Sequence, residues 1–95
     1  MKEEKTWHVY ILECRDDSLY TGITNNLDKR MATHKAGKGS KYVKIKGFNR
    51  LLHTIKADNK IEAAKMEYKI KQLDRNEKIT FFMKHPMLDF SIIKA

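Results

Sequence analysis

Two short apolar segments near the start of the chain limit the folds that it can adopt. Residues 6–13 (TWHVYILE) and 19–24 (LYTGIT) are rich in aromatic and β-branched side chains and are too short for typical helices. Each is therefore predicted to form a strand. Residues 15–18 (RDDS) have the composition of a turn. The chain is expected to begin with a β-hairpin, whose register the sequence does not fix.

Helix and loop signals follow the hairpin. Residues 24–26 offer N-caps for a helix over residues 27–34 that ends near Gly37. Residues 37–47 hold three of the four glycines and a run of lysines, which predicts a basic loop before a third strand at 49–56. Cap signals at 59–62 and 74–77 then predict two helices, one ending at about residue 73 and one near His85, which precedes Pro86.

This order of elements predicts an α+β fold with a small, largely antiparallel three-stranded sheet flanked by helices (strand, strand, helix, strand, helix, helix). The 95 residues suit a single domain over residues 1–95, with its motif-bearing core at about 6–85. The apolar tail, residues 88–95, is expected to be able to dock on it. No apolar run approaches the roughly 18 residues that cross a bilayer, and the N-terminus lacks a signal-like stretch, so a cytoplasmic protein without membrane contact is expected.

Several kinds of site are excluded by spacing. The lone cysteine, Cys14, forms no intrachain disulfide or thiolate metal cluster and is expected to be a small buried hydrophobe. The four histidines show no paired spacing of metal ligands. Residues 37–41 (GKGSK) lack the spacing of a phosphate loop and follow a predicted helix rather than a strand, so no nucleotide cofactor is expected.

Positive charge is concentrated in the middle of the chain. Residues 29–56 contain nine Lys or Arg and no Asp or Glu, within a net charge of +8. Such a block either faces solvent with counterions or binds a polyanion. On duplex DNA, affinity would fall by about 0.9 log unit per log unit of salt for each phosphate neutralised. The candidate nucleic-acid-binding residues are Lys29, Lys38, Lys41, Lys44 and Lys46.

A carboxylate interrupts the apolar side of the predicted helix at 60–73. With residues spaced by about 100° and Ile61 at zero, Glu67 falls at roughly 240°, within an apolar arc from roughly 120° to 360°. A carboxylate directed there must be paired, protonated or bound to a cation. Two interpretations stay open, an i,i+4 ion pair with Lys71 and a metal-binding or catalytic role. The arc contains Ile61, Ala63, Ala64, Met66, Tyr68, Ile70 and Leu73.

The first predicted helix repeats this feature, because Arg30 and His34 share a stripe with Leu27 and Met31 and should face the sheet. Snorkelling is the simpler interpretation of Arg30 alone. Together with Glu67 and the hairpin tyrosines, however, the set suits phosphoryl chemistry. An arginine can stabilise charge on phosphoryl oxygens, and a carboxylate can hold Mg²⁺ directly or through water. A tyrosine, with an ordinary pKa of about 10, could be a general base only if a neighbouring cation lowered that value.

As a set, these residues resemble the motifs of the GIY-YIG nucleases, most closely those of the small stand-alone bacterial members of the YhbQ/YazA-like group. The resemblance covers nearly all of residues 6–80. Residues 8–10 (HVY) stand at the first motif and residues 20–22 (YTG) at the second. Thr24, Arg30, His34 and Glu67 follow. His8 and Thr21 depart from the glycine and isoleucine of the name-giving motifs, and neither departure removes a functional side chain.

The resemblance implies an endonuclease that hydrolyses phosphodiester bonds in nucleic acid, expected to be DNA, with one Mg²⁺ or Mn²⁺ ion held by Glu67. Arg30 and His34 would contact the scissile phosphate. Tyr10 or Tyr20 would help to activate the attacking water, with Tyr10 favoured. Because family members usually gain target choice from an added DNA-binding domain, specificity here is expected from the basic loop, from DNA structure or from a protein partner. The alternatives are a nucleic-acid-binding module of the same fold that does not cut, and a protein-interaction domain.

Overall fold

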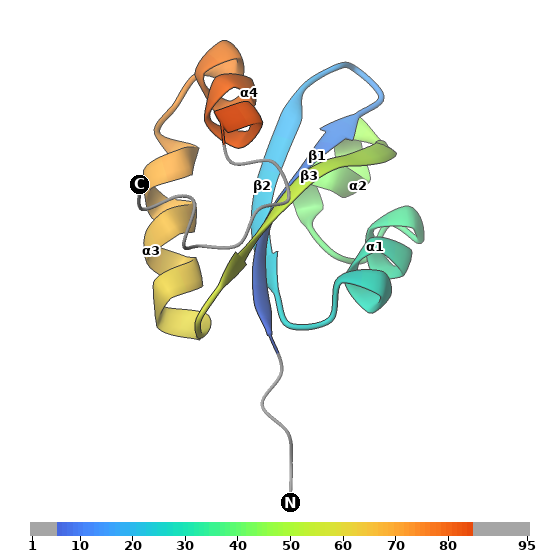
Figure 1. The fold of residues 1–95 in the computed structure, drawn as a ribbon. Coiled ribbons are helices and arrows are strands. Elements are labelled where there is room, and N and C mark those ends of the chain that lie inside the picture. The colour runs from blue at the N-terminus through green and yellow to red at the C-terminus, as the bar shows by residue number, and fades with distance from the viewer. Residues whose placement is uncertain (1–5, 85–95) are drawn as a thin grey trace, which may run out of the picture.

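The computed structural model describes residues 6–84, which form one antiparallel sheet covered by helices on both faces. The strands lie in the order β2-β1-β3, and Figure 1 shows α3 and α4 on one side of them and α1 and α2 on the other. The predicted α+β fold with a three-stranded sheet is thus confirmed. The elements are β1 (Trp7–Cys14), β2 (Leu19–Thr24), α1 (Leu27–Lys35), α2 (Lys41–Lys46), β3 (Phe48–Ala57), α3 (Lys60–Lys71) and α4 (Arg75–Lys84).

The predicted hairpin is present, and its turn closes through local polar contacts. Asp16 Oδ1 accepts hydrogen bonds from the backbone N–H and the hydroxyl of Ser18. Asp17 adopts a φ of 71°, in the left-handed region that aspartate tolerates better than most residues. In the resulting register Glu13 lies opposite Leu19, and Tyr10 lies opposite Gly22.

Successive side chains of β1 point to opposite faces of the sheet and so pack into two different cores. Val9 and Ile11 belong to a core with Ala63 and Ile70 of α3 and Phe82 of α4. Tyr10, Leu12 and Cys14 belong to a second core with Val43 of α2, packed against half-buried Leu27 and Met31 of α1. Cys14 is buried and free, in agreement with the prediction. Tyr10 is therefore enclosed on the face covered by α1 and α2.

Residues 37–47 differ from the loop that the sequence predicted, because residues 41–46 form the short helix α2. Ser40 caps this helix by accepting a hydrogen bond from the Val43 N–H, and Gly47 ends it at a φ of 88°. Val43 is the buried side chain of the helix. A helix of six residues is too short to show an apolar repeat, so the glycines and lysines dominated the pattern.

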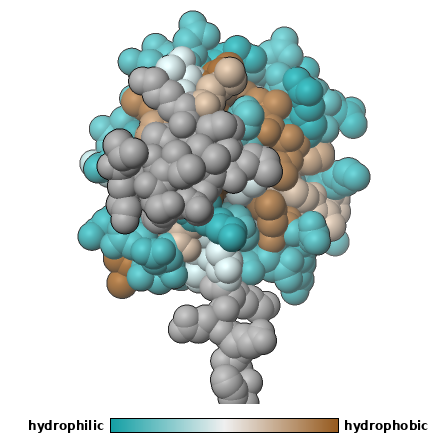
Figure 2. All heavy atoms as spheres, in the orientation of Figure 1, coloured by the Kyte–Doolittle hydropathy of each residue, from teal (hydrophilic) through white to brown (hydrophobic). Residues whose placement is uncertain are grey.

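The buried face of α3 is narrower than the predicted arc. Ala63 and Ile70 are buried and Met66 is half-buried, whereas Ile61 and Tyr68 are 66% and 71% exposed. Hydrophilic residues dominate the face of the molecule seen in Figure 2, with apolar side chains gathered in smaller areas. The predicted helix end near His85 and the tail at 88–95 lie outside the described residues. Within residues 6–84, no helix is both long and apolar enough to cross a membrane.

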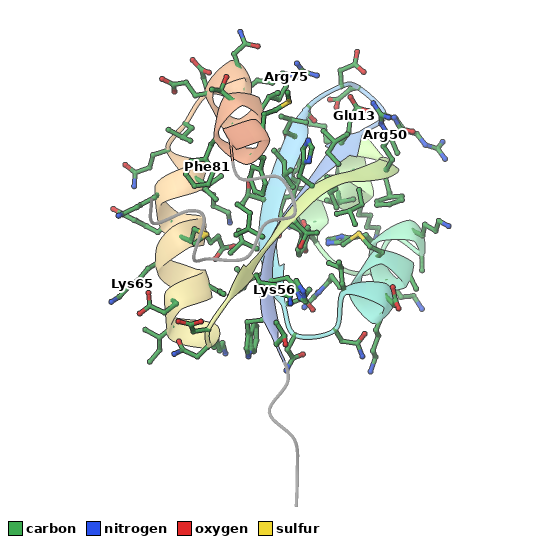
Figure 3. All side chains as sticks on the ribbon, viewed as in Figure 1. Glu13, Arg50, Lys56, Lys65, Arg75 and Phe81 are labelled. Atoms are coloured by element: carbon green, nitrogen blue, oxygen red, sulfur yellow. The ribbon has the colours of Figure 1, made fainter. Side chains whose placement is uncertain are left out.

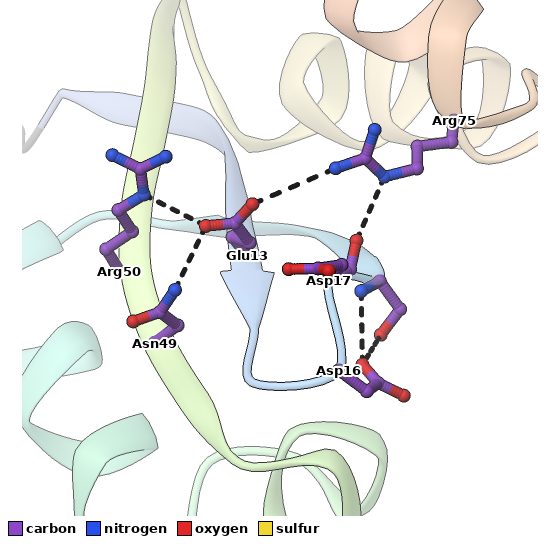
Figure 4. Close-up of polar contacts among 7 residues, drawn as sticks. Glu13, Asp16, Asp17, Asn49, Arg50 and Arg75 are labelled. Carbon is purple, nitrogen blue, oxygen red and sulfur yellow. Dashed lines mark hydrogen bonds and ion pairs between the residues drawn. The ribbon is translucent and has the colours of Figure 1, made fainter.

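A polar network joins α4 to the sheet (Figures 3 and 4). Glu13 is buried, and its Oε1 accepts hydrogen bonds from Asn49 Nδ2 at 3.0 Å and Arg50 Nε at 2.9 Å. Arg75 of α4 places Nη2 3.8 Å from Glu13 Oε2 and donates from Nε to the Asp17 carbonyl at 2.9 Å. The Glu13 carboxylate thereby connects β1, β3 and α4, and Arg75 connects α4 to the hairpin turn.

Candidate active site

Tyr10 and His34 form a buried hydrogen bond between the central strand and α1. Tyr10 Oη lies 2.8 Å from His34 Nε2, and each residue is 2% exposed. The start of α1 is fixed by Asn26, whose side chain accepts from the Lys29 N–H at 3.1 Å. Thr24 Oγ1 accepts from the Asn26 N–H at 3.0 Å and so ties β2 to this cap. His34 faces the sheet as predicted.

Two more tyrosines extend this pair toward the surface. The ring of half-buried Tyr20 lies 5.6 Å from that of His34 and 6.3 Å from that of Tyr10, between centroids. Tyr42 of α2 stacks on Tyr20 at 5.9 Å with an interplanar angle of 28°, and it is 40% exposed. Sequence reasoning missed Tyr42 because its segment was predicted to be a loop.

Two glycines allow the backbone to approach the Tyr10–His34 pair closely. A Cβ at Gly22 would overlap the hydroxyl of Tyr10, which lies opposite it in the sheet. A Cβ at Gly39 would lie 2.7 Å from His34 Nδ1. Both distances are far below an ordinary van der Waals contact, so these positions exclude larger residues unless the aromatic side chains move.

The surroundings of the pair determine its protonation. Burial raises the pKa of Tyr10 well above its usual range, electrostatic interactions with Tyr20 and Glu67 raise it further, and the charge of Arg30 opposes them. Burial, and then the charge of Arg30, lower the pKa of His34 below 6.5. At neutral pH Tyr10 is therefore protonated and His34 neutral, so Tyr10 can donate its proton to Nε2. Nδ1 of His34 is buried and has no partner among residues 6–84.

Glu67 approaches this cluster from the other side of the sheet. Its side chain is 23% exposed, and its Oε2 lies 3.3 Å from Lys71 Nζ. Of the two interpretations of this carboxylate, the i,i+4 ion pair is therefore formed. Lys71 Nζ also lies 5.7 Å from the centroid of the Tyr20 ring. Because the charge of Glu67 acts on Tyr10, the carboxylate belongs to the electrostatic surroundings of the buried pair.

Arg30 completes the set of five residues that the sequence predicted. It is half-buried on α1, and its charge acts on both Tyr10 and His34. Tyr10, Tyr20 and His34 are in contact, and Arg30 and Glu67 lie near enough for their charges to act on Tyr10. Two strands and two helices supply these five residues.

Glu67 is the candidate ligand for a metal ion here. Across the described residues, no group of three or more His, Cys, Asp or Glu side chains is placed to hold a metal. Mg²⁺ often binds through one or two carboxylates, keeps several waters and uses substrate phosphate as a further ligand. A single, partly exposed carboxylate fits an open site of this kind, in which water and substrate would supply the other ligands, and does not fit an all-protein cage. The Lys71 ammonium beside Glu67 would oppose the binding of a second cation.

The lysines predicted to bind nucleic acid are exposed on α1, on α2 and between them. Lys29, Lys38, Lys41 and Lys44 have no acidic partner in the part of the chain that the structure describes. Lys46 differs, because it pairs with Asp16 at 3.0 Å and lies 5.7 Å from the centroid of the Tyr42 ring. These four lysines therefore contribute free positive charge on this side of the molecule, as does exposed Lys35 of α1.

Comparisons with known proteins identify the family to which the chain is similar. A family model described as the GIY-YIG catalytic domain matches residues 6–80. The UPF0213 protein OB0043 of Oceanobacillus iheyensis is 54% identical over 72 residues, covering 76% of this chain and 84% of that protein. The UPF0213 protein H16_B0156 of Cupriavidus necator is 41% identical over 86 residues, covering 90% and 94%. The solution NMR structure of the UPF0213 protein BH0048 from Bacillus halodurans is similar, with a TM-score of 0.52, 42% identity and coverage of 82% and 83%.

Proposed function

The chain belongs to the GIY-YIG catalytic-domain family, and from this membership we propose that it is a divalent-metal-dependent endonuclease that hydrolyses phosphodiester bonds in nucleic acid, with DNA as the expected substrate. The observation that carries the proposal is the buried Tyr10–His34 hydrogen bond within reach of the charges of Arg30 and Glu67. A proton donor and acceptor, a cation and a carboxylate meet there, which is the set that phosphoryl transfer needs.

Glu67 and Arg30 have different electrostatic roles in this proposal. Glu67 would hold one Mg²⁺ or Mn²⁺ ion, which when bound would act as a Lewis acid on a phosphate oxygen. The half-buried guanidinium of Arg30 faces the phosphate and stabilises the charge that grows on its oxygens in the transition state. A fixed cation is worth more in this partly buried position than in water, because the surrounding side chains exclude solvent.

Tyr10 and His34 would handle the proton of the attacking water. Burial opposes a free phenolate at Tyr10, so Tyr10 cannot act as a base by losing its proton beforehand. The 2.8 Å bond to neutral His34 offers another route. As Tyr10 Oη accepts the proton of the water, its own proton passes to His34 Nε2. The condition set by the sequence, a cation that lowers the pKa of Tyr10, is not met, so it is this relay that keeps Tyr10 as the favoured base. His34 would serve the relay in place of the phosphate contact that the resemblance implied. Tyr20 packs against both rings and is the alternative base.

The exposed lysines of α1 and α2 would guide nucleic acid to this site. Lys29, Lys38, Lys41 and Lys44 have no acidic partner among the described residues, and Lys46 supplies a weaker, shared charge. Contacts of this kind neutralise phosphates without reading the base sequence, so target choice is expected from DNA structure or from a protein partner. We place the activity in the cytoplasm.

The test is a cleavage assay on single-stranded, duplex and branched DNA and RNA, with Mg²⁺, with Mn²⁺ and with a chelator. Wild-type protein should cut at least one substrate, and the chelator should stop it. Glu67→Ala should abolish cleavage with the fold intact by circular dichroism. Glu62→Ala is the matched control, because Glu62 lies on the same helix and pairs with Lys65 at 3.8 Å. Wild-type-like cleavage by Glu67→Ala, or binding without cleavage by the wild type, would contradict the proposal.

A further inference from the structure

Lys71 has two contacts at the candidate active site that the proposed roles do not use. Its ammonium lies 3.3 Å from Glu67 Oε2 and 5.7 Å from the centroid of the Tyr20 ring. It therefore lies between the proposed metal ligand on α3 and a tyrosine on β2. The Glu67 side chain is 23% exposed, so the carboxylate of this ion pair is less open to solvent than that of an ordinary surface pair.

A divalent ion bound at Glu67 would lie close to the Lys71 ammonium, whether it used Oε2, which the ammonium contacts, or the other carboxylate oxygen. A metal ion approaches a carboxylate oxygen to about 2.0–2.1 Å, so the two like charges would repel each other at close range. Because the carboxylate is partly shielded from water, its attraction for Lys71 is screened less than it would be at an open surface. Metal binding at Glu67 and the Lys71–Glu67 ion pair therefore weaken each other.

The structure also limits where Lys71 can stay once it is displaced. Lys78 of α4 is close enough for the charge of Lys71 to contribute, after burial, to lowering the pKa of Lys78. The positive charge of Lys78 makes movement of the Lys71 ammonium toward α4 unfavourable. The Lys71 side chain is 48% exposed, so its ammonium can instead turn outward into solvent on its flexible stem.

We propose that Lys71 is a resident counter-ion of Glu67 that competes with the metal, so that it stabilises the metal-free site and weakens the affinity of the free protein for divalent ions. The inference rests on the proposed function, because it takes Glu67 as the metal ligand. Lys71 acts through Glu67 in this account and is a positioning residue, with no contact to the reacting atoms.

The test measures Mn²⁺ affinity in the absence of nucleic acid, by the electron paramagnetic resonance signal of free Mn²⁺. Lys71→Met removes the charge and keeps a chain of similar length, and it should bind Mn²⁺ about tenfold tighter than wild type, within the usual range of couplings between two bound groups. Lys71→Arg keeps the cation and should resemble wild type. Lys65→Met is the matched control, because Lys65 pairs with Glu62 and stands on the side of α3 away from the sheet (Figure 3).

The outcomes separate this inference from the proposed function. Tighter binding by Lys71→Met, with Lys65→Met unchanged, supports the counter-ion role. Unchanged or weaker binding by Lys71→Met overturns it, and the metal site itself stands if Glu67→Gln removes the binding seen in wild type. If Glu67→Gln binds Mn²⁺ as wild type does, Glu67 is not the ligand, and both the proposed metal site and the counter-ion role fail.

Discussion

Gly22→Ala should destabilise the protein through a single collision with a buried ring. The added Cβ would lie 2.6 Å from Tyr10 Cζ and 3.1 Å from Cε2. Carbon atoms ordinarily pack at about 3.5–4.0 Å, so the ring has to retreat by about 1 Å. Tyr10 is only 2% exposed and packs in the core with Leu12 and Val43, which leaves it little room.

The expected loss of stability combines three terms. Overpacking a buried site costs about 1–3 kcal/mol. Weakening the Tyr10–His34 hydrogen bond adds about 1 kcal/mol. Replacing glycine by alanine returns about 0.4–1 kcal/mol through the unfolded state, because the backbone of Gly22 is not in the left-handed region. The net loss is about 1–4 kcal/mol. Each kcal/mol lowers the Tm by about 4–8 °C in a domain of this size.

Urea unfolding followed by circular dichroism measures this loss, and a double-mutant cycle assigns its cause. Tyr10→Phe removes the hydroxyl that the new Cβ would overlap, so Gly22→Ala should cost at least about 0.5 kcal/mol less in that background. The steric account is refuted if Gly22→Ala is as stable as wild type. An equal cost with Phe at position 10 would refute the part assigned to the hydroxyl and its hydrogen bond, because phenylalanine keeps the ring carbons that the Cβ also meets.

Three further predictions concern the charges around the site. Arg30→Ala should lower the single-turnover cleavage rate by about 100-fold, with a much smaller change in nucleic-acid affinity; equal losses would assign Arg30 to binding alone. Because burial lowers the pKa of His34 below 6.5, the unfolded chain takes up a proton first as pH falls, and stability is lost below about pH 6.5. The free energy of unfolding, measured in urea at about pH 7.5 and 5.5, should therefore fall more between these two pH values in wild type than in His34→Asn. Equal decreases in the two proteins would refute this role of His34. Lys44→Ala should reduce the slope of log affinity for duplex DNA against log salt concentration by about 0.9. Lys65 lies on α3, which covers the opposite face of the sheet, so Lys65→Ala should leave this slope unchanged. Equal effects of the two substitutions would contradict the proposed binding surface.

Local interactions explain which parts of the fold the sequence could predict. The side chains of Asn26 and Asn59 cap α1 and α3, and Asp74 and Glu77 form a reciprocal capping box at the start of α4. Each of these signals involves residues only three positions apart, so it is visible in the sequence. The hairpin is likewise closed by contacts within its own turn.

Features set by tertiary packing were harder to predict. Ile61 and Tyr68 are exposed because of the side of α3 that packs on the sheet. The periodicity of the sequence could not show which part of the predicted apolar arc would be buried. The Glu13 network was not predicted, because its partners come from β3 and α4. The positions of Arg30, His34 and Glu67 stood out on their helices, but the Tyr10–His34 bond depends on the register of β1 and on how α1 packs.

The structure forms one of the two predicted interpretations of Glu67, the ion pair with Lys71. The metal-binding role is our proposal, and the ion pair is compatible with it as a competing contact of the same carboxylate. Sequence reasoning could name both partners because they lie four residues apart on one helix. It could not show that Lys71 would also reach the Tyr20 ring.

The most direct test of the central claim compares single-turnover cleavage by wild type and Glu67→Gln at saturating Mg²⁺, on whichever nucleic acid the wild type cuts. Glutamine keeps the size of the side chain and removes its charge, and Glu62→Gln controls for loss of a carboxylate on the same helix. The rate of Glu67→Gln should fall by at least about 100-fold with nucleic-acid binding retained, while Glu62→Gln cuts normally. A Glu67→Gln protein that cuts at the wild-type rate would contradict the account.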